Sequence, residues 1–87
     1  MKKVYVINID NYDYLLSDGK NEYKRNSEFY SKKRPMKGDI IYLSDKVLSD
    51  NTMLSFIEPY NDSNLSVDDI IKVVSNGEEY YLQREYG

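Results

Sequence analysis

The dipeptide Asn76–Gly77 lies between two short runs of strand-forming residues. Asn–Gly flanked in this way is the strongest short-range signal for a two-residue β-hairpin. Pairing about this turn sorts the flanking residues onto two faces, one with Val73, Tyr80, Ile71 and Leu82, and the other with Val74, Glu79, Lys72, Tyr81, Ile70 and Gln83. The acids before residue 70 also resemble a helix N-terminus, but the β-branched run that follows favours strand. We therefore predict a hairpin, preceded by at most one helical turn at 65–69.

Two more turn signals, Asp10–Asn11 and Asp18–Gly19, divide the first 25 residues into three segments of strand-forming residues. If each turn is a two-residue loop, both hairpins direct the same set of side chains to one face. That set is Tyr5, Ile7, Ile9, Tyr12, Tyr14, Leu16 and Tyr23. Agreement between two independent turns predicts a three-stranded meander that buries this set.

The rest of the chain adds short strands at 40–44 and 53–57, one capped helical turn at 44–48, and an irregular segment at 26–37. Alanine, the best helix former, is absent, which argues against a helical protein. We predict a mainly β fold, α+β at the margin. The expected architecture is a small curved antiparallel sheet or partly open barrel of about six to seven short strands, with one or two helical turns.

Cysteine and histidine are both absent, which removes disulfides, thiolate metal sites, the commonest general base and the commonest metal ligand. We expect no catalytic residues, no cofactor and no metal. Eighty-seven residues are enough for one modest core, so we expect a single domain over residues 1–87. The N-terminal apolar run is too short for a signal peptide, and no stretch could span a membrane. With abundant Asn, Lys, Tyr and Ile, this predicts a cytoplasmic protein of an AT-rich bacterium or its phage.

Charge is distributed unevenly along a chain whose formal net charge is −3. Residues 1–37 carry nine Lys/Arg against five Asp/Glu, a net +4, and residues 38–87 carry three against ten, a net −7. An ordered array of carboxylates on a rigid sheet can imitate backbone phosphates and attract a basic groove. We predict a partner-binding surface on the C-terminal hairpin, where exposed tyrosine adds rigid contact area. Its residues are Asp68, Asp69, Glu78, Glu79, Tyr81 and Glu85.

The basic residues of the first half support an alternative interpretation. A loop rich in lysine and arginine, with Phe29 and Tyr30 as stacking surfaces, would contact the phosphates of a nucleic acid. The residues of this alternative nucleic-acid-binding site are Lys24, Arg25, Lys32, Lys33, Arg34 and Lys37. A third interpretation is assembly through an exposed strand edge, which would include a homodimer.

The segment RPMKGDIIYL, residues 34–43, resembles the P-x-x-GD sequence that leads into a strand in PUA-like, ASCH-type and SH3-like small β-barrels. It covers about a tenth of the chain and bears on the fold alone. In size and composition the chain also resembles the small phage-encoded inhibitors of bacterial defence, anti-CRISPR proteins above all. These proteins are short, poor in cysteine and rich in Tyr, Asp and Glu. The resemblance implies a protein partner with a basic surface, such as a nuclease.

Together these observations predict a small acidic, tyrosine-rich protein that acts by stoichiometric protein–protein interaction. We expect it to inhibit a nucleic-acid-processing defence enzyme by occupying the basic groove of that enzyme, as a DNA mimic does. The alternatives are a nucleic-acid-binding small β-barrel that uses the basic loop at 24–37, and a strand-edge assembly protein.

Overall fold

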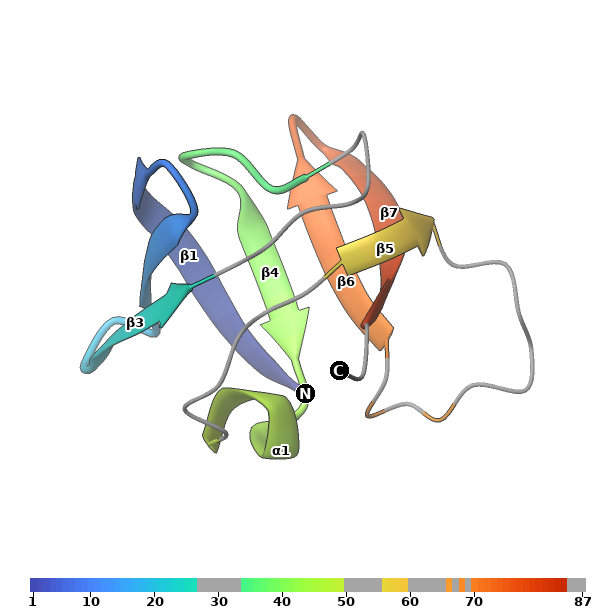
Figure 1. The fold of residues 1–87 in the computed structure, drawn as a ribbon, viewed down its shortest axis with the longest axis horizontal. Coiled ribbons are helices and arrows are strands. Elements are labelled where there is room, and N and C mark those ends of the chain that lie inside the picture. The colour runs from blue at the N-terminus through green and yellow to red at the C-terminus, as the bar shows by residue number, and fades with distance from the viewer. Residues whose placement is uncertain (27–33, 50–55, 60–65, 67, 69, 85–87) are drawn as a thin grey trace.

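The computed structural model describes residues 1–26, 34–49, 56–59, 66, 68 and 70–84, and its strands form one antiparallel sheet (Figure 1). The strands are β1 Lys2–Asp10, β2 Asp13–Ser17, β3 Glu22–Asn26, β4 Ile40–Leu43, β5 Phe56–Pro59, β6 Ile70–Ser75 and β7 Glu78–Arg84, and the helix α1 spans Asp45–Ser49. The seven strands lie in the order β3-β2-β1-β4-β6-β7-β5. The predicted mainly β, antiparallel fold is confirmed.

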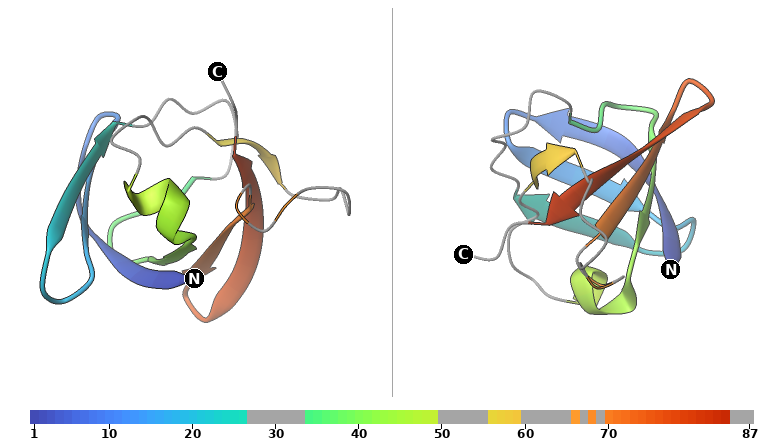
Figure 2. Two further views of the ribbon diagram at one scale, coloured as in Figure 1. Left: turned by 90° about the horizontal axis from the view of Figure 1, so that it is seen from below. Right: turned by 90° about the vertical axis from the view of Figure 1, so that its right-hand side faces the viewer.

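The sheet is strongly curved, and α1 lies against its concave side (Figure 2). The buried apolar side chains form one cluster that draws on α1 and on both halves of the sheet. Its members are Val4, Val6, Tyr14, Leu16, Ile41, Leu43, Val47, Leu48, Ile71, Val73 and Leu82. Curvature around the short helix α1 allows these short strands to share one core.

The hairpin of β6 and β7 has the predicted register, with Val73 opposite Tyr80. Asn76 and Gly77 both adopt positive φ, of 52° and 80°, as a two-residue type I′ turn requires. The alternation of side chains then places the apolar residues of one face in the core. The prediction of strand rather than helix after residue 69 is therefore confirmed.

β1 and β2 are connected by a different turn from the predicted one. Asp10 is opposite Asp13, so the loop residues are Asn11 and Tyr12 instead of Asp10 and Asn11. Asn11 has φ 56°, a conformation that asparagine tolerates better than most residues. Tyr12 is 54 % exposed in this turn, so the prediction that it is buried is wrong.

A β-bulge at Ile7 interrupts the ladder between β1 and β2. Before the bulge, Val4 and Val6 face the core, while Tyr5 and Ile7 are 41 % and 37 % exposed. After the bulge, Ile9 packs against the core. The additional residue reverses which side chains are buried, and for this reason the predicted burial of Tyr5 and Ile7 is wrong and that of Ile9 is right.

β2 and β3 are joined by a four-residue turn at 18–21, two residues longer than predicted. The Asp18 carboxylate accepts hydrogen bonds from the backbone N–H groups of Lys20 and Asn21, at 2.8 and 2.7 Å. Because the difference in length is even, it does not change which face each residue occupies. The side chains predicted to face the core from these strands do so: Tyr14, Leu16 and Tyr23.

Tyr14 connects the core to the segment before β4. Its hydroxyl donates a hydrogen bond to the backbone carbonyl of Pro35. Burial raises the pKa of Tyr14 to about 12, so the hydroxyl remains a donor at physiological pH. This contact holds residues 34–37, the described end of the segment at 26–37 that was predicted to be irregular, against the sheet.

The remaining elements lie close to their predicted positions. β4 and α1 match the predicted strand at 40–44 and helical turn at 44–48 to within one residue at each end. The Val47 N–H donates to the Ser44 hydroxyl at 3.2 Å, which caps the helix. β5 overlaps the end of the predicted strand at 53–57, whose earlier residues lie outside the described part of the chain. In the described ranges, no helix has the length and apolar character needed to cross a membrane.

Candidate functional site

The convex side of the sheet, which we call the outer face, carries the side chains that point away from the core. The ladder registers place four of them in one line across neighbouring strands, which we call the Lys–Tyr row: Lys3 on β1, Tyr42 on β4, Lys72 on β6 and Tyr81 on β7. Lys3 is exposed, Tyr42 and Lys72 are half-buried, and Tyr81 is 42 % exposed. Ammonium and phenol groups therefore alternate across the middle of the sheet.

The two lysines of the row lie against aromatic rings. The Lys72 Nζ is 4.9 Å from the centroid of the Tyr42 ring, and the Lys3 Nζ is 5.2 Å from that of Tyr5, both within cation–π range. The Lys72 Nζ also lies 3.1 Å from a carboxylate oxygen of Glu79, and this contact raises the pKa of Lys72. Contact with the Tyr5 side chain raises the pKa of Lys3. Both lysines are therefore cationic at physiological pH.

The β6–β7 hairpin brings together three of the six predicted partner-binding residues. Glu78 and Glu79 are exposed beside the turn, and Tyr81 follows them on β7. Because successive strand residues alternate, Glu79 and Tyr81 share the outer face, whereas Glu78 lies on the other side of the strand. The cluster is thus a two-residue patch on one face with a further carboxylate at the hairpin tip.

Asp68 lies apart from these three residues. It is half-buried just before β6, and its N–H donates to the Ser66 hydroxyl at 3.1 Å. The length of β6, about 20 Å at 3.3 Å per residue, separates it from the hairpin tip. The other two predicted residues, Asp69 and Glu85, lie outside the described residues.

The described members of the predicted basic site lie at two places. Lys24 is exposed on β3, whereas Arg34 and Lys37 are exposed in the segment that precedes β4. These belong to different parts of the chain, and Pro35, beside Arg34, accepts the hydrogen bond from Tyr14 on β2, the strand next to β3. Lys32 and Lys33 fall outside the part of the chain that the structure describes.

Arg25, also predicted to contact nucleic acid, is only 8 % exposed. Its guanidinium donates to the backbone carbonyl of Lys24 at 2.8 Å and to that of Leu48 in α1, and it lies 5.7 Å from the Tyr23 ring centroid. The position of Arg25 on β3 turns it toward the concave side. Its interactions therefore join β3 to α1, and this corrects the expectation of a surface cation.

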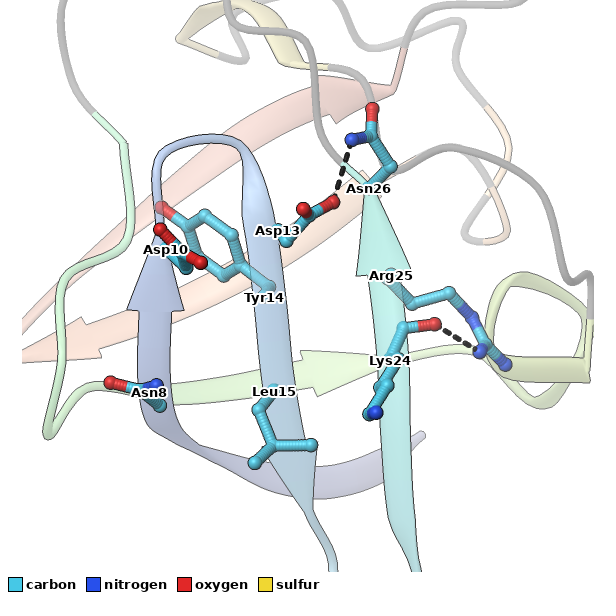
Figure 3. A pocket seen from close by; sticks show the side chains of 8 residues that line it. All are labelled: Asn8, Asp10, Asp13, Tyr14, Leu15, Lys24, Arg25 and Asn26. Atoms are coloured by element: carbon cyan, nitrogen blue, oxygen red, sulfur yellow. Dashed lines mark hydrogen bonds between the residues drawn. The ribbon is translucent and has the colours of Figure 1, made fainter.

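An open hollow of about 580 Å³ lies over β1, β2 and β3 (Figure 3). Its lining residues are Asn8, Asp10, Asp13, Tyr14, Leu15, Lys24, Arg25 and Asn26. The Asn26 side-chain amide donates to the Asp13 carboxylate at 2.8 Å. No group of three potential metal ligands comes together anywhere in the described ranges. The hollow presents carboxylates, side-chain amides and cations from three neighbouring strands.

The sequence alone did not identify Lys3 and Tyr42 as neighbours on the outer face of the sheet. The hairpin register did place Lys72 opposite Tyr81, but the extension of the row requires β4 to lie between β1 and β6. A local signal for Tyr42 was present, because it alternates with the apolar residues Ile41 and Leu43 and must occupy the opposite face.

No protein-family model matches this chain, and neither a curated protein nor a solved structure matches it. The likeness to anti-CRISPR proteins therefore remains one of size and composition. The function has to be inferred from the surfaces of the chain itself.

Proposed function

We propose that this protein acts without catalysis, by forming a stoichiometric complex with another protein through the β6–β7 hairpin. The observation that carries this proposal is the exposure of Glu79 and Tyr81 on the same face of one hairpin, with Glu78 at its tip. A carboxylate beside an exposed tyrosine combines charge complementarity with a large, rigid contact area. This combination suits the recognition of a protein surface.

The hairpin supports the proposal because it is held in place before any partner binds. Its ladder runs without a break from the pair Ile70–Gln83 to the pair Ser75–Glu78. On the core side, Ile71, Val73 and Leu82 are fully buried. A surface that is already ordered loses little conformational entropy on association.

We infer that the partner is a bacterial protein with a basic surface. The exposed carboxylates of the hairpin belong to residues 38–87, whose net charge is −7. Enzymes that process nucleic acids bind phosphates with clustered lysine and arginine, and such a groove attracts carboxylates held on a rigid sheet. The composition shared with anti-CRISPR inhibitors favours an enzyme of bacterial defence, whose groove this protein would occupy as a DNA mimic.

Affinity capture with matched variants tests the proposal. The tagged protein is incubated with a nuclease-treated lysate of an AT-rich bacterium, and the captured protein is purified and assayed for nucleic-acid binding. We expect one near-stoichiometric partner that is retained by the wild type but bound roughly tenfold more weakly, or not at all, by Glu78→Lys/Glu79→Lys. The control Glu22→Lys reverses an exposed carboxylate on β3 and should retain the partner. The partner should lose its nucleic-acid binding in the complex.

Two outcomes would contradict parts of this proposal. Equal affinity for the wild type and for Glu78→Lys/Glu79→Lys would show that the hairpin carboxylates do not contact the partner. A partner that binds nucleic acid equally well inside the complex would exclude occupation of its groove.

A further inference from the structure

We propose that the outer face also binds single-stranded nucleic acid, with bases stacked on Tyr42 and Tyr81 and with phosphates held by Lys3 and Lys72. The proposal needs only the Lys–Tyr row and its immediate neighbours. It goes beyond the protein complex proposed above and holds whether or not that complex forms.

Three ladders fix the geometry of the row. Lys3 pairs with Tyr42, Tyr42 with Lys72, and Lys72 with Tyr81. Neighbouring strands lie about 4.8 Å apart, so the Cα atoms of Tyr42 and Tyr81 are about 10 Å apart, with Lys72 on the strand between them. A bound nucleic-acid strand would run perpendicular to the β-strands, across β1, β4, β6 and β7.

The residue types of the row match the two chemical components of a nucleotide. Aromatic rings stack on the flat face of any base, and lysines attract the phosphates between successive bases. The Lys72 Nζ lies over the Tyr42 ring, 4.9 Å from its centroid, so a base that stacks on this ring displaces the ammonium group toward the neighbouring phosphate. Tyr5, 41 % exposed beside Lys3, adds a third ring at the β1 end.

The position of the row favours a single strand over a duplex. Reading a duplex requires a helix or a ribbon that enters a groove, whereas the row lies on the face of the sheet, away from its turns. A single strand can spread its bases over such a face, as it does on other sheet surfaces that carry aromatic residues. The alternation of cation and ring supplies charge complementarity to this occupant.

A substitution of Glu79 tests the proposal, because it should change nucleic-acid binding and protein binding in opposite directions. Its carboxylate lies 3.1 Å from the Lys72 Nζ on the same face, where it competes with a phosphate for that ammonium group. Glu79→Gln should therefore strengthen nucleic-acid binding. The protein complex proposed above depends on the same negative charge and should be weakened by Glu79→Gln, so the two proposals fail independently.

Fluorescence anisotropy measures the binding directly. The probes are labelled oligo-dT, oligo-U and a DNA duplex, each of about 12 nucleotides or base pairs, which is within the site size of small β-folds. We expect the wild type to bind one or both single strands more tightly than the duplex. Tyr81→Thr should weaken the binding roughly 5- to 150-fold, and Tyr81→Phe, which keeps the ring, should not. Lys3→Gln/Lys72→Gln should weaken it and flatten its salt dependence. The control Tyr12→Thr, at the exposed β1–β2 turn, should have no effect.

Absence of binding to every probe at low salt would overturn the proposal. So would equal affinity for single strands and duplex that Tyr81→Thr leaves unchanged, because that pattern indicates non-specific charge attraction. Far-UV circular dichroism confirms that each variant is folded, and Lys3→Gln/Lys72→Gln tests the row if Tyr81→Thr does not fold. Weaker binding by Glu79→Gln would exclude Lys72 as a phosphate ligand.

Discussion

The Asp18 carboxylate holds the β2–β3 turn together through several contacts at once. It accepts hydrogen bonds from the N–H groups of Lys20 and Asn21, lies 3.0 Å from the Lys2 ammonium, and accepts a hydrogen bond from the Tyr23 hydroxyl. The backbone hydrogen bonds are the main reason that the pKa of Asp18 lies far below its usual value. Because the pKa is lower in the folded state than the value of about 3.9 in the unfolded chain, the stabilisation is complete above that value. It is lost as the pH falls through the folded-state pKa.

Removal of this charge should therefore change the acid sensitivity of the protein. We expect the free energy of unfolding of the wild type to fall between about pH 5 and about pH 2.5, and that of Asp18→Asn to fall less. Urea unfolding at each pH measures both quantities. Glu22→Gln, which neutralises a carboxylate that is exposed on β3, should follow the wild type. Parallel curves for the wild type and Asp18→Asn would contradict the assignment.

At the scale of single residues, the exposure of a side chain can be predicted from the sequence only where a local turn determines its position. Glu78, Glu79 and Tyr81 could be placed on one hairpin because the Asn76–Gly77 turn determines their positions locally. Arg25 could not be placed, since arginine is mostly exposed in proteins. Its burial depends on contacts with α1, a segment more than 20 residues away in sequence.

At the scale of elements, local turn chemistry explains both the correct and the incorrect predictions. Asn76–Gly77 is a turn in which both residues favour positive φ. In the β1–β2 turn only Asn11 favours positive φ. Asn11 can be the first or the second residue of a two-residue loop, so the sequence did not decide between a loop at 10–11 and one at 11–12. The bulge at Ile7 reversed the faces of the β1 residues before it, and no residue type marks it in the sequence.

The β6–β7 turn should be sensitive to the loss of its glycine. Gly77 has φ +80°, and a Cβ added at this residue would meet no atom within 4 Å, so a substitution there changes backbone energy without a clash. We expect Gly77→Ala to lower the free energy of unfolding by about 1 kcal/mol, because L-residues disfavour this conformation. Chemical denaturation measures the change. Lys20→Ala, at an exposed turn position without positive φ, should stay within about 0.5 kcal/mol of the wild type. Equal stability of Gly77→Ala and the wild type would show that the turn can adopt another conformation.

At the scale of the whole molecule, the order of the strands determines the outer face. Each strand could be recognised by its own pattern, but the Lys–Tyr row exists only because β4 pairs with both β1 and β6. These pairings join segments that are about 30 residues or more apart in sequence. Such long-range contacts depend on the packing of the complete core, and turn signals do not specify them.

The buried cluster that the described residues form also predicts how the whole protein unfolds. Val47 in α1 is 1 % exposed and belongs to a core that includes β1 and β7. We therefore expect one cooperative transition for residues 1–87, followed equally by tyrosine fluorescence and by far-UV circular dichroism. Val47→Ala should lower the free energy of unfolding by about 2 kcal/mol and shift both signals together, whereas Lys46→Ala, exposed on the same helix, should change little. Separate midpoints for the two signals would contradict a single domain, because one half of the sheet would then unfold without the other.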